Sequence, residues 1–211
     1  MKVEPGLLDI YMVTNTFLNL KKEKKDRIIE AAKKEFSRVP LDKALVSNII
    51  RDSKIPRGSF YQYFENIDDL FIYIIDEMRK KVLESYQDVV TGDEYFDVLK
   101  KNFYKALTIF ENGENKQFNL NIYMSFINLE MKGSSFLNDL NKLRISEEDS
   151  YVPKEVRDLP NSRIFLGLIE MANITCLNEF VLGKKNKKEV FEEYSSYLDY
   201  IQKAIIKTNK L

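Results

Sequence analysis

Apolar side chains recur along this chain at intervals of three and four residues, the spacing of one face of an α-helix. Glycine and proline, which interrupt helices, number only seven and five in 211 residues. The chain shows no internal repeat and no convincing pair of strands. The pattern therefore predicts an all-α protein, with helices over about residues 21–37, 46–53, 56–63, 68–88, 94–111, 116–131, 133–143, 162–182 and 188–207.

The segment 47–70 holds two short helical patterns around a turn at residues 54–56. Pro56 suits the first turn of the second helix, where its missing N–H is not needed. Phe60, Tyr63 and Phe64 fall at i, i+3 and i+4 and should point into a small core. The second helix then keeps side chains outside that bond phosphates and base edges, namely Arg57, Ser59, Tyr61 and Gln62. This arrangement is typical of a helix-turn-helix.

The charge is balanced over the whole chain but not within this region. Lys/Arg and Asp/Glu number 33 each, whereas residues 21–60 contain twelve basic and six acidic side chains. A basic patch confined to one module is the electrostatic footprint of phosphate binding. For residues 21–25 alone, a solvated basic helix is the alternative interpretation.

The amino-acid composition excludes most kinds of enzyme active site. The chain has no histidine, so catalytic triads that need one and histidine-containing zinc sites are excluded. The single cysteine, Cys176, lies in an apolar run and should behave as a small hydrophobic residue. We therefore expect no enzyme activity, metal or cofactor. The chain opens without a signal-peptide pattern and has no uninterrupted apolar run of about 18 residues, so we expect a cytoplasmic protein with no membrane partner.

The run R-G-S-F-Y-Q-Y-F at 57–64, followed by E-N-x-x-D-L-F at 65–71, resembles the signature of TetR/AcrR-type transcriptional regulators. The segments 16–20 and 27–36 are similar to the lead-in and first helix of that family, so the resemblance covers about residues 16–75. It implies a lead-in at 1–20, a three-helix DNA-binding domain at 21–66, and a helical ligand-binding and dimerisation domain at 67–211. The residues expected to bind DNA are Ser47, Asn48, Arg57, Gly58, Ser59, Tyr61 and Gln62.

Two positions depart from the family pattern. Many members place a lysine for a phosphate contact where this chain has Ile67, so only backbone amides remain there for that contact. A threonine or serine commonly caps the helix that begins near Ala44 and Leu45, and we expect Asp42 or Ser47 to replace it.

The last helix carries one apolar stripe, and the resemblance implies that the last two helices form a four-helix interface in a homodimer. Two-fold symmetry suits a palindromic operator. Packing within one subunit is the alternative for the same residues. The interface residues expected are Phe165, Ala172, Cys176, Tyr194, Tyr197, Leu198, Ile201 and Ile205.

The middle helices are rich in aromatic residues and methionine, and the resemblance implies a small-molecule inducer site in this domain. Pockets are mostly apolar with a few polar groups, but ordinary cores look the same in sequence. The candidate lining residues are Phe103, Phe110, Tyr123, Phe126, Met171 and Asn173.

The sequence thus predicts a homodimeric repressor that binds a palindromic double-stranded DNA operator and is released by a small apolar or amphipathic effector. One alternative is a helical ligand-binding or protein-interaction module whose helix-turn-helix no longer binds DNA, which the Ile67 departure favours. A small helical enzyme is a third alternative, with no group of residues behind it.

Overall fold

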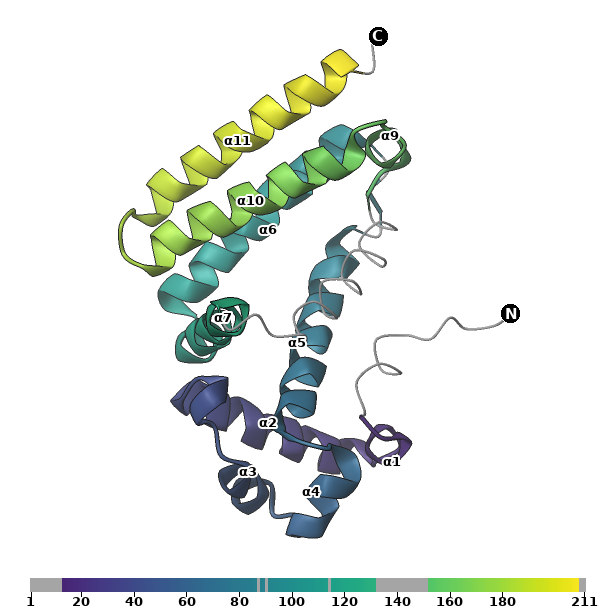
Figure 1. The fold of residues 1–211 in the computed structure, drawn as a ribbon, viewed down its shortest axis with the longest axis vertical. Helices are drawn as coiled ribbons and strands as arrows, with labels where there is room; N and C mark the ends of the chain where they lie inside the picture. The colour runs from purple at the N-terminus through teal and green to yellow at the C-terminus, as the bar shows by residue number, and fades with distance from the viewer. Residues whose placement is uncertain (1–12, 87, 90, 114, 132–151, 209–211) are drawn as a thin grey trace, which may run out of the picture. The chain divides into compact units, whose positions relative to one another are not determined.

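The computed structural model describes residues 13–131 and 152–208 except 87, 90 and 114, and for 126–131 and 206–208 it describes the backbone alone. Every regular element in these residues is a helix (Figure 1). The all-α prediction is therefore confirmed. The helix predicted at 133–143 lies outside the described residues.

The helices follow the predicted order, with a short first helix that periodicity did not predict. The elements are α1 (Asn15–Leu18), α2 (Lys22–Arg38), the 3-10 helix η2 (Leu41–Lys43), α3 (Val46–Ser53), α4 (Arg57–Tyr63), α5 (Ile67–Leu83), the 3-10 helix η3 (Glu84–Tyr86), α6 (Gly92–Asn112), α7 (Lys116–Met131), α9 (Lys154–Arg157), α10 (Ser162–Val181) and α11 (Lys187–Thr208).

The chain divides into two compact units. The first comprises Met1–Lys81 with Gln117–Asp139, and the second comprises Val82–Lys116 with Leu140–Leu211. The first unit contains the helix-turn-helix region but is larger than the predicted range 21–66, because α1, α5 and α7 contribute buried residues to the same core.

Aromatic rings fill the core of the first unit. Phe36 of α2 meets Phe71 of α5 edge to face, with ring centroids 5.4 Å apart. Phe60 and Phe64 pack on each other at 5.4 Å and are fully buried, as the i, i+4 spacing predicts. Each such ring removes a large apolar area from water, which fixes α2, α4 and α5 as one body.

α7 belongs to this unit because it completes the end of α2. The Asn121 side chain donates to the carbonyls of Phe36 and Ser37 at 2.8 and 2.9 Å. These carbonyls lie in the last turn of α2, where no further helical N–H is available. The hydroxyl of Ser125, one turn later in α7, accepts from the Leu41 amide at 3.0 Å. Both polar side chains are buried, and they supply hydrogen-bond partners to backbone groups about 85 residues earlier in the chain.

The second unit packs α6, α10 and α11 side by side, with α9 against their end (Figure 1). Thr91 and Glu94 form a capping box that starts α6. Glu155 of α9 accepts a hydrogen bond from the Gly92 amide at the same end. At the centre, the rings of Phe103 and Tyr194 lie 4.0 Å apart and are tilted by 30°.

Candidate nucleic-acid interface

The turn of the helix-turn-helix is formed by residues 54–56. Lys54 ends α3 in the left-handed region, with φ 55° and ψ 43°. Ile55 is buried beneath the turn, and Pro56 adopts the extended conformation that precedes α4. Ser53 is also buried and donates its hydroxyl to the Ile49 carbonyl at 2.6 Å. These two buried residues hold the turn against the core, which sets the direction in which α4 leaves it.

α4 presents one buried face and one solvent face. Phe60 and Tyr63 point into the core, whereas Arg57, Tyr61 and Gln62 are exposed. The Arg57 guanidinium lies 5.9 Å from the centroid of the Tyr61 ring. Within the described residues, these exposed side chains make no hydrogen bond to the protein, so their donors and acceptors are available to a ligand.

Gly58 and Ser59 complete this face of α4. Ser59 is half-buried, and Gly58 is exposed. A Cβ built on Gly58 meets no atom within 4 Å, and the residue is not in the positive-φ region. The fold therefore does not require glycine here, although glycine in a helix costs about 1 kcal/mol relative to alanine.

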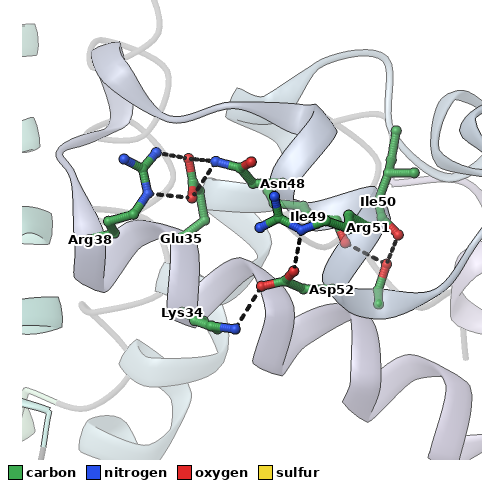
Figure 2. Close-up of polar contacts among 9 residues, drawn as sticks. Lys34, Glu35, Arg38, Asn48, Ile49, Ile50, Arg51 and Asp52 are labelled. Atoms are coloured by element: carbon green, nitrogen blue, oxygen red, sulfur yellow. Dashed lines mark hydrogen bonds and ion pairs between the residues drawn. The ribbon is translucent and has the colours of Figure 1, made fainter.

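The carboxylate of Glu35 joins α2 to the start of α3 (Figure 2). Its carboxylate is only 4% exposed and accepts from Arg38 at 2.6 and 3.0 Å and from the Leu45 amide at 2.8 Å. The Asn48 amide donates to both carboxylate oxygens, at 3.1 and 3.0 Å. Hydrogen bonds from Arg38 are the largest cause of a lowered Glu35 pKa, and they outweigh burial, which acts in the opposite direction.

This network changes the interpretation of the start of α3. The Asn48 side-chain amide is bonded to Glu35 inside the domain, which argues against a DNA contact through this group. Ser47 is exposed. No side chain caps α3 at Leu45, so the expectation that Asp42 or Ser47 does so is wrong. The Glu35 carboxylate supplies negative charge at that helix N-terminus instead.

A second polar contact links the same two helices (Figure 2). Asp52 pairs through one oxygen with Lys34 of α2 and through the other with Arg51 of α3, each at 2.8 Å. Hydrogen bonds from Lys34, then from Arg51, lower the Asp52 pKa. Asp52 thereby orients the exposed Arg51 guanidinium.

Side chains at the start of α5 cap the N-terminus of this helix. The Asn66 side-chain oxygen accepts from the amides of Asp68 and Asp69 at 2.8 and 3.1 Å. Asp69 in turn accepts from the Glu65 amide at 2.8 Å and from the Asn66 amide at 3.4 Å. Ile67 is half-buried. Backbone amides near Ile67 were the groups expected to contact a phosphate, and four of them are already bonded within the chain.

The predicted pocket residues fall in both units. Tyr123 and Phe126 lie on α7 in the first unit, and the other four lie in the second. Phe103 is buried against Tyr194, Phe110 and Asn173 are half-buried, and Met171 is 65% exposed. The side chain of Phe126 lies outside those that the structure describes. A pocket lined by these residues stays a prediction.

The predicted dimer stripe is mostly inside the second unit. Six of its side chains are buried in the chain's own core and offer a partner almost no surface: Ala172, Cys176, Tyr194, Leu198, Ile201 and Ile205. Phe165 is half-buried against this core, and Tyr197 is exposed. For the six buried residues, packing within one subunit is the interpretation that fits.

A different apolar stripe lies on the surface of α10. Ile164, Leu168 and Met171 fall at i, i+4 and i+7 and are exposed, with Ile174 beside them. Sequence reasoning missed this stripe because α10 is apolar on both faces, so periodicity did not separate them. The same composition makes α10 long and apolar enough, with mean hydropathy 1.4, to meet a membrane-span criterion based on length and composition alone.

Metal-binding chemistry is not evident in the described part of the chain. No group of three or more Cys, Asp or Glu side chains there is arranged to hold a metal ion. The Cys176 thiol is buried in the second unit, and burial is the largest cause that raises its pKa to about 11.

Comparison with known proteins supports the interpretation of the first unit. Residues 28–74 match the family model for bacterial regulatory proteins of the tetR family. The chain is 32% identical over 73 residues to the uncharacterized HTH-type transcriptional regulator YvdT of Bacillus subtilis (strain 168), over 35% of this chain and 38% of that protein. The chain thus matches less than two fifths of the length of this relative.

A structural comparison covers more of the chain at lower similarity. A TetR family transcriptional regulator from Chloroflexus aurantiacus J-10-FL aligns over 93% of this chain and 96% of its own, with 17% identity and a TM-score of 0.33.

Proposed function

We propose that this chain, whose residues 28–74 match the model for the tetR family of bacterial regulatory proteins, represses transcription as a homodimer on a palindromic DNA operator. A small apolar or amphipathic effector releases it from DNA. Such an effector must bind the released state more tightly than the DNA-bound state. Because it acts on the chromosome, the protein works in the cytoplasm.

The observation that carries DNA binding is the solvent face of α4. Arg57, Tyr61 and Gln62 are exposed, and the polar groups of their side chains form no hydrogen bond within the described residues. Arginine pairs with guanine or phosphate, and glutamine with adenine. Gly58 also favours DNA binding, because a helix that exposes a glycine without structural need is less stable than one with alanine there. Close approach of DNA to the backbone is a physical reason for that residue.

Ser47 and Ser59 are the remaining candidates for phosphate contacts. Ser47 lies exposed in the first turn of α3, and Ser59 lies half-buried in the first turn of α4. Lys21 and Lys22 are exposed at the start of α2 and add positive charge that attracts any DNA sequence.

The homodimer interface that we propose is the exposed stripe of α10. Its side chains Ile164, Leu168 and Met171 lie one turn apart along the helix and present large apolar surfaces to water. Exposed apolar groups that form a contiguous stripe mark an interaction site. A second copy of the chain is the natural occupant, because a two-fold dimer places two recognition helices on a palindrome.

A Gly58→Ala variant tests the DNA face without disturbing the fold. Alanine has space at this position and favours the helix, so the thermal midpoint should be unchanged or raised. The added methyl group should lower affinity for an operator selected in vitro by about tenfold or more, because it holds the backbone away from DNA. Gln62→Ala should cost about 1–3 kcal/mol and relax base preference at one position. Normal operator affinity in both variants would refute the assignment.

The occupied amides at the start of α5 favour the second candidate, a module that no longer binds DNA. Selection of duplexes from a random library decides between the two. Enrichment of a palindromic sequence by the wild-type chain supports the repressor. If no sequence is enriched at low salt, the chain is the module instead.

Met171→Glu tests the dimer, with Met171→Leu as the matched control. A carboxylate in the proposed interface would be desolvated without a partner, so the dimer should dissociate. Operator affinity should also fall, because one half-site contact replaces two. Sedimentation equilibrium measures the assembly and circular dichroism checks the fold. A folded Met171→Glu chain with the wild-type mass would place the interface elsewhere.

The effector is tested by linkage. Compounds that bind the free protein should raise its melting temperature and weaken operator binding over the same concentration range. A broad panel of apolar compounds with no effect on either quantity would argue for a constitutive repressor.

A further inference from the structure

The first described residues of the chain are bonded to the end of α4, the proposed recognition helix. The Thr14 hydroxyl donates to the Gln62 carbonyl at 2.7 Å, and the Thr14 amide donates to the Tyr63 carbonyl at 3.2 Å. α4 ends at Tyr63, so these two carbonyls have no partner within the helix. Thr14 thus caps the C-terminus of α4 from a distance of 48 residues along the chain.

Phe17 anchors this contact in the core. Its side chain is fully buried, with its ring centroid 4.6 Å from that of Phe64 and 5.2 Å from that of Tyr73. Thr14 also caps α1, since its hydroxyl oxygen accepts from the Phe17 amide at 3.4 Å. One hydroxyl therefore serves the start of α1 and the end of α4 together.

The other end of α1 is held by α2. The Lys25 ammonium donates to the Leu18 carbonyl at 2.9 Å and lies 5.6 Å from the Phe17 ring centroid. Lys24 lies over the Tyr63 ring at 5.4 Å. Two lysines of the basic run 21–25 are thus engaged in holding α1 and α4, which the charge pattern alone did not indicate.

We propose that residues 13–18 form a clasp on the recognition helix and that Thr14 is a positioning residue for sequence readout. This inference rests on the proposed DNA-binding function. α4 has seven residues, fewer than two turns, and an isolated helix of that length is unstable in water. Gln62 is its penultimate residue, so fraying at this end would move a base-reading side chain directly. The family match begins at residue 28, so the clasp lies outside it.

Thr14→Val tests the clasp, because valine keeps the shape of the side chain and removes the hydroxyl. Thr16→Val is the matched control, since Thr16 is exposed on α1 and its hydroxyl has no hydrogen bond within the described residues. The probe is the duplex of highest affinity selected by the wild-type chain, compared with a scrambled duplex of equal length. Binding is measured by fluorescence anisotropy.

The Thr14→Val variant should bind the selected duplex about 5- to 10-fold more weakly, the loss expected for one hydrogen bond. Its affinity for the scrambled duplex should be unchanged, because phosphate contacts do not depend on the position of Gln62. Thr14→Ser keeps the hydroxyl and should restore most of the lost affinity. A merely structural role would weaken both duplexes equally.

Equal binding of the selected duplex by Thr14→Val and Thr16→Val would overturn the inference. Equal weakening on both duplexes would overturn it too. If circular dichroism shows Thr14→Val to be unfolded, the same comparison is made with Thr14→Ala. A wild-type chain that selects no sequence would overturn the proposed function itself, which is a different result from loss of the clasp alone.

Discussion

Replacing Glu35 by glutamine is the most direct test of how the helix-turn-helix is held together. Glutamine has the same shape, so the cavity stays filled, but the negative charge is lost and one acceptor oxygen becomes an NH2 donor. The wild-type carboxylate accepts from Arg38, Leu45 and Asn48 in a site that is 4% exposed. At least one of these donors would then face another donor.

The expected loss in the free energy of unfolding follows from the number and type of these hydrogen bonds. Hydrogen bonds to a charged group contribute about 1.5–3 kcal/mol each, and an unsatisfied buried donor costs about 1–3 kcal/mol. The Arg38 side chain is about half exposed and can turn to water, which limits the loss on that side. The Leu45 amide cannot turn away. We expect Glu35→Gln to lower the free energy of unfolding by about 2–3 kcal/mol at pH 7.

Glu30→Gln is the matched control. Glu30 lies on the same helix, and its side chain is 71% exposed and, within the described residues, pairs with Lys33 alone. An exposed pair of this kind contributes about 0.5 kcal/mol or less. Urea unfolding followed by circular dichroism at 222 nm measures both variants against the wild-type chain. Equal stabilities of the two variants would refute the reasoning.

The stability difference between Glu35→Gln and the wild-type chain should depend on pH, which gives a second check. The pKa of Glu35 is lowered in the folded chain, so its stabilising contribution is complete above the ordinary glutamate pKa of about 4.3. It is lost as the pH falls through the folded-state pKa. The gap between Glu35→Gln and wild type should therefore stay constant from about pH 7 to 5 and shrink below about pH 4. A gap that already closes between pH 7 and 5 would contradict the lowered pKa.

Three further predictions concern the buried residues of the two units. Asn121→Leu should destabilise the chain by about 1–3 kcal/mol in urea unfolding, because the last carbonyls of α2 lose their donor; an unchanged midpoint would contradict that role. Cys176, with its thiol buried and its pKa near 11, should resist labelling by a thiol reagent at pH 7.5 until the chain is unfolded in guanidinium; rapid labelling of the folded chain would count against its burial. Leu198→Asp should unfold the second unit rather than yield a folded monomer, because Leu198 is fully buried within the chain; a folded monomer in sedimentation would restore Leu198 to the dimer interface.

Residue spacing and charge along the chain were enough to predict the local elements and the character of the first unit. Phe60, Tyr63 and Phe64 at helical spacing predicted both the recognition helix and its buried face. The excess of basic residues between 21 and 60 predicted a module for phosphate binding. These features depend on neighbours one or two turns apart, and side-chain spacing on a helix is fixed by the helix itself.

Contacts between distant segments could not be predicted from the chain and became visible in the folded structure. Asn48 looks like a free polar group in the sequence, yet it is bonded to Glu35 of another helix. Thr14 lies in a segment without periodicity, yet it closes the end of α4. In α10, the stripe at Ala172 and Cys176 is buried while the stripe at Met171 is exposed. Periodicity shows that a helix has an apolar face, but which partner covers that face depends on how the helices meet, and that geometry arises only when the whole core is assembled.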